Sequence, residues 1–469
     1  MRRSAEARIL ILGAGPCGLA CARELKRLGH RNWRLLESAT GAGGLASSVL
    51  DAAGFTWDLG GHVVFSHFGE FDALLEEVLG PDISRHDRSS YIRFGDRWIP
   101  YPFQNHLRHL PATVRDECLE GLATAPGASA GMDFAAWMAA VFGPGITRHF
   151  MAPYNAKVWA TPAAQMSAGW IAERVAVVDY ARALDNVRAG RDDLAWGPND
   201  RFAFPVSGGT GEIYRRLADR LAQRIDYRRH VVGVDPVTRR VQTADGTTET
   251  YDALVSTLPL DRLVSALADC PDTVRAAAAQ LHHNGVYMVG VGYQRPLTDQ
   301  RSWLYFPDPS VPFYRVTNFA KYAAANVPGA DTDRYCAFMT ESAFTRDHGE
   351  SRTGIEERVQ AGLEATGLAP RSAPVASVHL EEIEYAYPVP TLDRDAALAV
   401  IQPWLNEHDV LSRGRFGAWR YEEGNMDHAV KMGIDAARRL VTGAEEELWR
   451  APAGAGVSPP PRSRSGRGG

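Results

Sequence analysis

Lysine and cysteine are both scarce in this sequence, and each shortage narrows what the protein can be. Only four of the 51 basic residues are lysine; biased codon use explains this ratio simply, although arginine is also the better partner for a diphosphate. The five cysteines are an odd number and mostly lie far apart, which excludes a disulfide framework and fits a reducing compartment. Cys17 and Cys21 stand four residues apart on a predicted helix, so we expect core thiols there and no metal site.

An excess of positive charge and a long apolar run are missing as well. The chain carries 51 basic and 56 acidic residues, and 451–469 alone hold three arginines, so the rest carries 48 against 56, or −8. A nucleic acid needs a basic face and an anionic membrane attracts basic segments, so we expect neither partner. No stretch approaches the ~20 apolar residues of a membrane span, and Ile9–Leu12 is too short for a signal peptide. The expected location is therefore the cytoplasm.

The N-terminal sequence predicts one complete βαβ unit. The whole chain is long enough for about three domains of ~150 residues. A buried strand at Ile9–Leu12 leads into a glycine-rich turn and a helix that stops at Gly29. A second strand follows at Trp33–Leu36. Further on we expect helices over 111–191, strands at 227–234, 240–243 and 253–256, antiparallel strands at 286–293, 303–306, 313–319 and 335–340, a helix at 434–448 and a disordered tail at 450–469.

The first turn carries the G-x-G-x-x-G pattern of a dinucleotide site. Gly13 makes the tight turn, Gly15 lets a pyrophosphate approach the backbone at the helix N-terminus, and Gly18 allows close packing of helix on strand. Glu37 ends the second strand 19 residues after Gly18, where a carboxylate can accept hydrogen bonds from a ribose. The alternative is a glycine-rich turn that binds nothing, which this strand–turn–helix context disfavours.

The residues after Glu37 favour FAD over NAD. A second glycine cluster at 41–47 and the segment DLGGH at 58–62 follow at once, as in FAD proteins of the amine-oxidase type, whereas a plain NAD domain continues with its next helix. The segment GNMDH at 424–428 precedes a helix and can close over the flavin end of the cofactor.

Several further blocks, in order along the chain, resemble the eukaryotic-type UDP-galactopyranose mutase family from about Ile9 to Trp449. They are DLGGHVVFSH (58–67), PYPFQN (100–105), PYNAKVW (153–159), GPN (197–199), FPVSGGTG (204–211), WLYFP (303–307) and SRGRFGAWRY (412–421). The resemblance implies an isomerase that interconverts UDP-galactopyranose and UDP-galactofuranose, in which N5 of reduced FAD attacks the anomeric carbon. NADPH or NADH would be the external reductant and, without a second nucleotide fingerprint, would enter the UDP-sugar cleft.

The resemblance also assigns roles to single residues. His62, Arg174 and Arg315 are the catalytic candidates, the arginines as ligands of the diphosphate. The substrate-binding candidates are Tyr101, Phe103, Gln104, Asn155, Trp159, Arg174, Asn199, Tyr305, Arg315, Tyr322, Tyr387 and Tyr421. The cofactor-binding candidates are Gly13, Gly15, Cys17, Gly18, Glu37, Ser38, Gly44, Leu45, Gly60, Gly61, His62, Val232, Arg415, Gly424, Asn425 and Met426, with Arg88 near the path of the electron donor.

The implied fold is α/β, with a discontinuous Rossmann-like FAD-binding domain, a helical insertion domain and an antiparallel β-sheet domain. The expected segments are 1–86, 200–285 and 412–449 for FAD, 105–195 for the helices, and 87–104 with 286–411 for the sheet. Two positions depart from the family: no Pro-Asn follows Arg174, and Ala429 replaces a small hydroxyl residue. The chain is also short after Tyr322, so a homo-oligomer is possible but the family's oligomer contacts are not carried over.

Three other readings stay open at this stage. A flavin oxidase of the amine-oxidase or protoporphyrinogen-oxidase kind would share the FAD domain but would not need the paired arginines. A mutase acting on a different UDP-sugar would keep the same chemistry. A flavoprotein that only binds or senses would leave its flavin spectrum unchanged when UDP-galactose is added.

Overall fold

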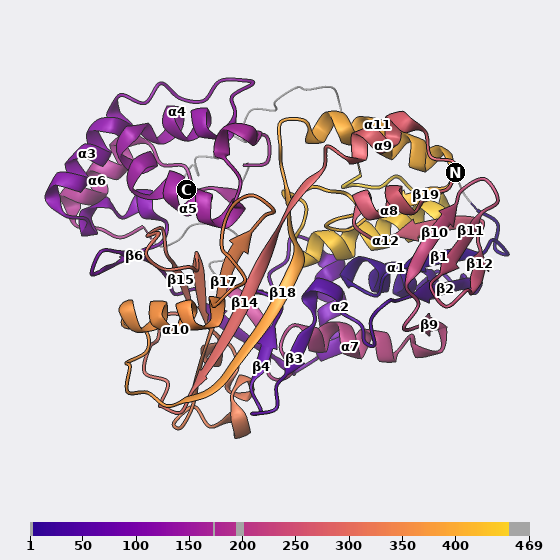
Figure 1. Cartoon of the computed structure of the whole chain (residues 1–469), viewed down its shortest axis with the longest axis horizontal. Helices are drawn as coiled ribbons and strands as arrows, with labels where there is room; N and C mark the ends of the chain where they lie inside the picture. Colours follow the sequence, from indigo (N-terminus) through magenta and orange to yellow (C-terminus); the bar gives the residue numbers. More distant parts are fainter. Residues whose placement is uncertain (1–2, 172–173, 194–200, 450–469) are drawn as a thin grey trace, which may run out of the picture.

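A five-stranded parallel sheet forms the right-hand part of the molecule in Figure 1. The computed structural model describes residues 3–171, 174–193 and 201–449. The predicted strands at Ile9–Leu12 and Trp33–Leu36 are confirmed, as is the one at Ala253–Ser256. Nearly all their side chains are buried, as expected for a parallel sheet covered on both faces. The sheet order is β19 (Val410–Ser412), β13 (Ala253–Ser256), β1 (Ile9–Leu12), β2 (Trp33–Leu36) and β9 (Ile225–Asp226).

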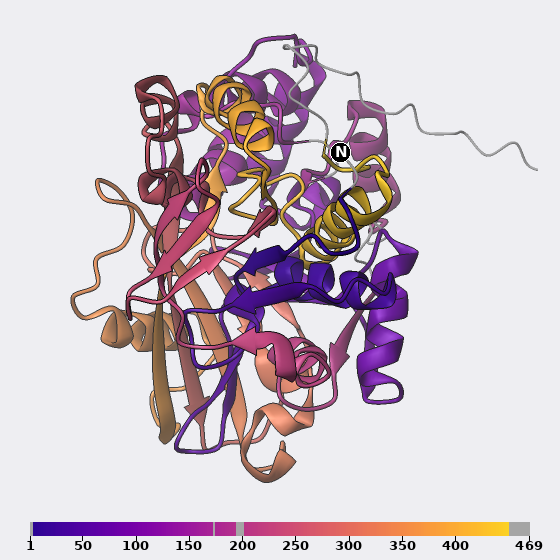
Figure 2. The same ribbon diagram turned by 90° about the vertical axis from the view of Figure 1, so that its right-hand side faces the viewer.

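Helices cover both faces of this sheet and give it its core. In Figure 2 the C-terminal helix α12 lies beside the N-terminal strands, and its buried Val430 and Ile434 join Leu19 of α1 in one cluster. That face is covered by α1 (Pro16–Arg27), α2 (Gly69–Leu79), α7 (Gly211–Asp219) and α12 (Met426–Thr442). The other face is covered by α8 (Leu260–Ala266), α9 (Asp272–Ala278), α11 (Arg394–Glu407) and the small sheet β10 (Val231–Asp235), β11 (Arg240–Thr243) and β12 (Thr248–Thr250).

A seven-stranded sheet runs through the centre of Figure 1, with the long strands β14 and β18 side by side. All its neighbours pair antiparallel except β15 and β6, which are parallel. Helix α10 (Ile355–Ala365) covers one face. The order is β18 (Val375–Val389), β14 (His282–Tyr293), β17 (Cys336–Phe344), β16 (Arg315–Asn318), β15 (Trp303–Tyr305), β6 (Ser90–Phe94) and β7 (Arg97–Pro100).

A group of helices stands beside the large sheet, at the upper left of Figure 1. They lie within the segment predicted to be helical and surround Phe134, Trp137 and Phe150. The helices are α3 (Ala112–Ala123), α4 (Phe134–Ile146), α5 (Ala152–Trp159) and α6 (Tyr180–Ala189). Two small strand pairs complete the fold, β3 (Ser48–Leu50) with β4 (Thr56–Asp58) and β5 (Ile83–Asp87) with β8 (Arg201–Pro205).

Three predicted elements are corrected by the structure. The last helix spans Met426–Thr442 and not 434–448: its first turns carry the polar residues Asp427, His428 and Lys431, which are buried and not exposed as their type suggests. Strand β18, rich in glutamate, was missed altogether. The strand expected at 227–234 is broken by Arg228, whose φ of 59° ends the run before β10 begins.

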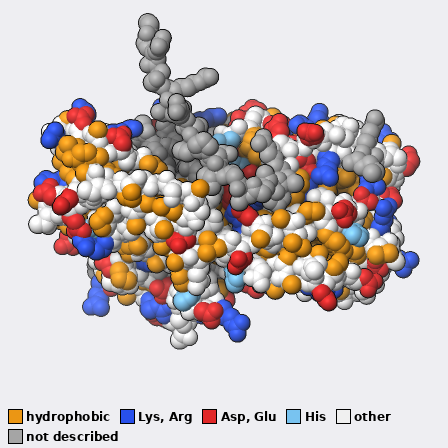
Figure 3. Space-filling model, turned by 90° about the horizontal axis from the view of Figure 1, so that it is seen from above, with side chains coloured by type: hydrophobic (Ala, Val, Ile, Leu, Met, Phe, Trp, Pro, Cys, Tyr) orange, Lys and Arg blue, Asp and Glu red, His pale blue; other side chains and the backbone are white. Residues whose placement is uncertain are grey.

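The surface agrees with the charge balance of the sequence. On the face shown in Figure 3, the basic and acidic side chains of the described residues are interspersed. Within the described ranges no helix has the length and apolar character needed to cross a membrane.

Candidate active site

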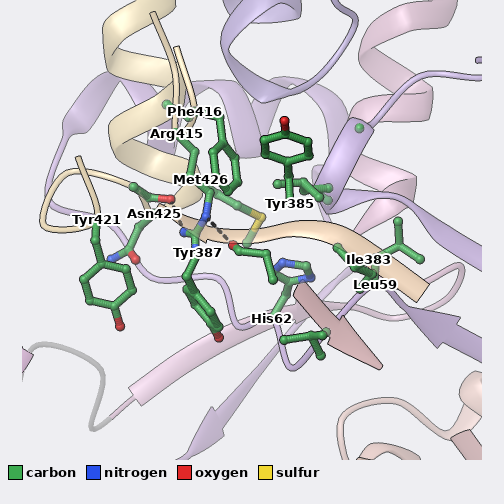
Figure 4. Close-up of a pocket in the computed structure, with 18 of the residues that line it drawn as sticks. Leu59, His62, Ile383, Tyr385, Tyr387, Arg415, Phe416, Tyr421, Asn425 and Met426 are labelled. Carbon is green, nitrogen blue, oxygen red and sulfur yellow. Dashed lines mark hydrogen bonds between the residues drawn. The ribbon is translucent and has the colours of Figure 1, made fainter. Parts of the chain in front are cut away.

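One cavity of about 840 Å³ lies where the three parts of the fold meet. Its volume lies toward the upper end of the ~300–1,000 Å³ of typical ligand pockets. Figure 4 shows residues from the glycine segment at 59–62, strand β18 and the segment 415–426 around the same space.

The first glycine turn opens onto one end of this cavity. A β-carbon on Gly18 would lie 1.9 Å from the carbonyl oxygen of Gly13, so Gly18 packs the helix on the strand and does not line the cavity. A β-carbon on Gly15 would meet its nearest atom only at 3.9 Å, which leaves the backbone there accessible from the cavity. Helix α1 begins after Gly15 with no side chain capping its N-terminus. Free N–H groups of this kind suit a pyrophosphate.

Glu37 and the second glycine cluster complete this end of the site. The Glu37 carboxylate accepts hydrogen bonds from the N–H of Ala14 (2.6 Å) and of Ala39 (2.7 Å), which fixes it at the cavity wall. Gly44 passes so close to Gly15 that a β-carbon on Gly44 would lie 3.3 Å from the Gly15 Cα. Ser38 and Leu45 line the same wall. An uncapped helix, a fixed acid and close glycine backbones are what the phosphates and ribose of FAD require.

The segment 415–426 forms the opposite wall. Arg415 is held by the carbonyl oxygens of Ala386 (3.0 Å) and Gly424 (2.7 Å). Asn425 precedes helix α12 without capping it, and Met426 faces the cavity beside Arg415 in Figure 4. The predicted residues Arg415, Gly424, Asn425 and Met426 are therefore brought together with Gly60, Gly61 and His62.

His62 is half-buried and projects into the cavity. Burial, helped by the charges of Arg415 and Arg315, lowers the pKa of its imidazole to about 4, so the ring is neutral at pH 7. Its Nδ1 atom is buried with no protein partner, which leaves it available to a bound group.

Arg315 stands on strand β16 with phenols around it. Its Nη2 donates to the hydroxyl of Tyr387 (3.3 Å), and that hydroxyl lies 3.4 Å from the hydroxyl of Tyr314. The guanidinium stacks over the Trp303 ring at 4.9 Å. Although burial alone would lower the pKa of Arg315, the neighbouring Glu341 carboxylate raises it well above its usual value, so the cation persists in this apolar setting.

Arg174 lies on the other side of the cavity from the large sheet. It donates to Asn425 Oδ1 (2.8 Å) and to the carbonyl oxygen of Glu422 (2.6 Å), and its guanidinium lies 5.2 Å from the ring of Tyr421. Its hydrogen bonds therefore tie the helical part of the fold to the segment before α12.

Aromatic rings form a shelf between the two arginines. Tyr101 and Tyr305 stack at 4.7 Å, and Arg88 lies over Tyr101 at 4.9 Å while donating to the Tyr305 hydroxyl at 3.0 Å. Trp159 packs edge-on against Tyr421 at 4.8 Å. Gln104 and Asn155 line the same region.

Besides Gly18, three predicted residues of the described ranges, Val232, Phe103 and Tyr322, lie outside the cavity. Val232 is 48% exposed and its neighbour Val231 lines the cavity instead, because successive residues of β10 face opposite ways. Phe103 is stacked on Phe150 in the core, and Tyr322 is buried among His86, Phe202 and Phe204. Neither Phe103 nor Tyr322 lines the cavity. Asn199 and the predicted disordered tail lie outside the described residues.

The sequence analysis missed Glu341, Tyr314 and Trp303 as parts of the site. All three line the cavity around Arg315. Trp303 stands in a matching block and could have been singled out there, whereas finding Glu341 needs the pairing of β16 with β17.

Asp58, at the base of the glycine segment, gives a pH-dependent prediction. Its carboxyl accepts hydrogen bonds from Ser48 Oγ (2.5 Å) and Thr210 Oγ1 (2.9 Å), yet burial raises its pKa to about 7. Between pH 4 and 7 the folded protein therefore holds a proton that the unfolded chain releases. The stabilisation from this proton is complete below about pH 4, falls as the pH rises from 4 to 7, and is absent above 7. We expect Asp58→Asn to gain at least about 1 kcal/mol relative to wild type between pH 5 and pH 8, measured by urea unfolding. A difference that stays constant with pH would contradict the assignment.

Comparison with known proteins agrees with this geometry. The family described as flavin containing amine oxidoreductase matches residues 16–441. A solved structure of reduced UDP-galactopyranose mutase superposes with a TM-score of 0.91 at 36% sequence identity, covering 94% of this chain and 95% of that one. Cyclohexylamine oxidase from Brevibacterium oxydans IH-35A (TM-score 0.64, 18% identity, 93% and 99% covered) and a fatty acid isomerase from P. acnes (0.61, 15%, 93% and 99%) share the fold.

Fold, glycine turn and family match together define a FAD-dependent protein with the amine-oxidase fold. The predicted α/β fold class and the FAD cofactor are thereby confirmed. The chain belongs to the UDP-galactopyranose mutase family, and is accordingly a flavin-dependent mutase of the isomerase class.

Proposed function

We propose that the protein interconverts UDP-galactopyranose and UDP-galactofuranose. The observation that carries this proposal is the position of Arg315 and its phenols: they line the same cavity as the glycine turn but come from the large sheet, separate from the FAD phosphate site. A substrate with its own diphosphate accounts for such a second anion site, whereas oxidation of an apolar amine does not. The related reduced mutase supports the same choice of substrate.

The chain's own residues then bind and orient the nucleotide sugar. Arg315 and the Tyr387 hydroxyl donate to the diphosphate and stabilise it while the bond to the anomeric carbon is broken. Arg174 contributes a second positive charge from the opposite wall. The aromatic shelf of Tyr101, Tyr305 and Trp159 offers flat faces to the uracil ring.

When bound and reduced, FAD supplies the nucleophile for this reaction through its N5 atom. The neutral imidazole of His62 faces the cavity and can accept or donate one hydrogen bond next to the flavin ring. The buried surroundings exclude water, so the displaced diphosphate stays paired with Arg315.

Anaerobic turnover with a sugar panel tests the proposal. The protein is reduced with dithionite, incubated with UDP-galactose and other UDP-hexoses, and the products are separated by chromatography. We expect UDP-galactofuranose from UDP-galactose, and none with the oxidised protein. Release of hydrogen peroxide from amines, with no change in any UDP-sugar, would instead identify an oxidase.

We also predict that UDP competes with NADPH or NADH for reduction of the flavin. The described residues contain one strand–glycine turn–helix unit of the dinucleotide kind, so a nicotinamide cofactor has to enter the cavity through the diphosphate side. Stopped-flow reduction at 450 nm, with increasing UDP, should show a rising apparent Kd for the reductant and an unchanged limiting rate. An unchanged Kd would place the reductant elsewhere.

A further inference from the structure

Glu341 is a buried carboxylate that the proposed reaction does not use. It lies on β17, directly opposite Arg315 of β16 and Met288 of β14, and is 3% exposed. Burying an acid is costly unless partners compensate for the lost water, so its partners indicate what it does.

The two oxygens of this carboxylate have different partners. Oε2 accepts a hydrogen bond from Nε of Arg315, and the two side chains form an ion pair. Oε1 accepts from the backbone N–H of Gly61 at 2.8 Å. Although burial alone would raise the pKa of Glu341, the charge and hydrogen bond of Arg315 and the Gly61 N–H lower it, so the group is ionised at neutral pH.

The first bond determines how Arg315 is turned. With Nε engaged by Glu341, the guanidinium cannot rotate freely about its own axis, and its Nη2 is directed at the Tyr387 hydroxyl. The terminal N–H groups thus face the cavity before any ligand arrives, which lowers the entropic cost of binding an anion there.

The second bond fixes the segment beside His62. A β-carbon on Gly60 would lie 3.0 Å from Glu341 Oε1, and one on Gly61 would lie 3.3 Å from Arg315 Nε. The glycine segment therefore rests directly on the Glu341–Arg315 pair, and His62 is the next residue along.

We propose that Glu341 is a positioning residue that orients Arg315 toward the diphosphate through one oxygen and holds the Gly60–His62 turn beside the flavin through the other. Occupation of the diphosphate site and the redox state of the flavin are thereby coupled through one side chain. The first half of this proposal, the orientation of Arg315 toward the diphosphate, rests on the proposed function. The second half, the support of the Gly60–His62 turn beside the flavin, rests on FAD binding alone.

A double-mutant cycle with UDP tests the first half. Glu341→Gln keeps the shape of the side chain but has one carbonyl oxygen in place of two carboxylate oxygens. That oxygen can accept from either Arg315 Nε or the Gly61 N–H, and the new NH₂ group repels the donor that is left. We expect UDP to bind about tenfold more weakly to Glu341→Gln, and expect no further loss when Glu341→Gln is added to Arg315→Ala. An equal loss in both backgrounds would show that Glu341 does not act through Arg315.

The reduction potential of the unliganded flavin tests the second half. Loss of a buried negative charge near the flavin makes added electrons more favourable, so the potential of Glu341→Gln should rise. Glu350→Gln is the matched control: Glu350 pairs with Arg358 and does not line the cavity, so the potential and UDP affinity of this variant should be unchanged. An unchanged potential in Glu341→Gln would overturn this half.

A variant that does not fold and a protein that does not bind UDP can each be distinguished from failure of the proposal. If Glu341→Gln does not fold, Glu341→Asp replaces it: the charge stays, but the shorter side chain cannot reach both Arg315 and Gly61. Loss of the Arg315 bond should weaken UDP binding, and loss of the Gly61 bond should shift the flavin potential, so at least one of the two should change. Wild-type values of both in Glu341→Asp would count against the proposal. If the unsubstituted protein does not bind UDP at all, the proposed function fails, and the potential of the folded variant still decides the second half.

Discussion

Arg315→Ala should lower kcat/KM for UDP-galactose about 10³-fold while FAD stays bound. Two losses combine in this variant. The diphosphate loses a donor that is already oriented, and Glu341 is left as a buried acid without its cation. The measurement is anaerobic turnover together with the ratio of flavin to protein absorbance.

Arg315→Lys separates these two losses. A lysine restores the positive charge beside Glu341 but not the fork that reaches Tyr387, so activity should fall between that of wild type and Arg315→Ala. Arg301→Ala is the matched control, because Arg301 pairs with Asp299 outside the cavity, and its kcat/KM should stay within about twofold of wild type. Near-normal turnover in Arg315→Ala would remove the role assigned to this arginine.

Gly15→Val should abolish FAD binding in a protein that still folds. The backbone of Gly15 has φ −79°, which any residue adopts, and a β-carbon there meets nothing closer than 3.9 Å. The added side chain therefore fits the empty turn but occupies the space where a pyrophosphate approaches the N–H groups of α1. We expect at least a ~100-fold loss of FAD affinity, measured by flavin fluorescence quenching on titration of the apoprotein.

Two other glycines make this test specific. A β-carbon on Gly69 meets nothing within 4 Å and Gly69 does not line the cavity, so Gly69→Val should bind FAD normally. Gly18→Ala should instead lower the free energy of unfolding by about 1–3 kcal/mol, because the backbone has to shift to separate its methyl group from the carbonyl oxygen of Gly13. Gly15→Val purified with stoichiometric flavin would contradict the position assigned to the pyrophosphate.

Local features of the sequence predicted the strand, turn and helix of the N-terminal βαβ unit well. The spacing of Gly13, Gly15, Gly18 and Glu37 depends only on one strand, one turn and one helix, and the structure forms that unit with the expected bounds within a few residues. The resemblance to a family was the only basis for identifying Arg315, Tyr305 and Tyr387. A tyrosine or arginine in a predicted strand does not by itself indicate that the side chain binds a ligand.

The features that the sequence did not predict depend on strand register and on burial. Glu341 becomes meaningful only when β17 is placed against β16, which no local pattern specifies. Val232 and Val231 differ by one residue, yet one faces solvent and the other the cavity. The start of α12 was missed because the polar residues Asp427, His428 and Lys431 in its first turns are buried, which their type does not indicate.

The order of strands in the parallel sheet has a consequence for biosynthesis. β1 pairs with β2 as soon as residue 36 is made, but its other neighbour, β13, ends at residue 256, and β19 follows only at 410. One edge of β1 therefore stays unpaired until residue 256 of 469 has been translated. Because unpaired apolar edges favour aggregation, we expect the nascent chain to be most prone to aggregate before β13 emerges.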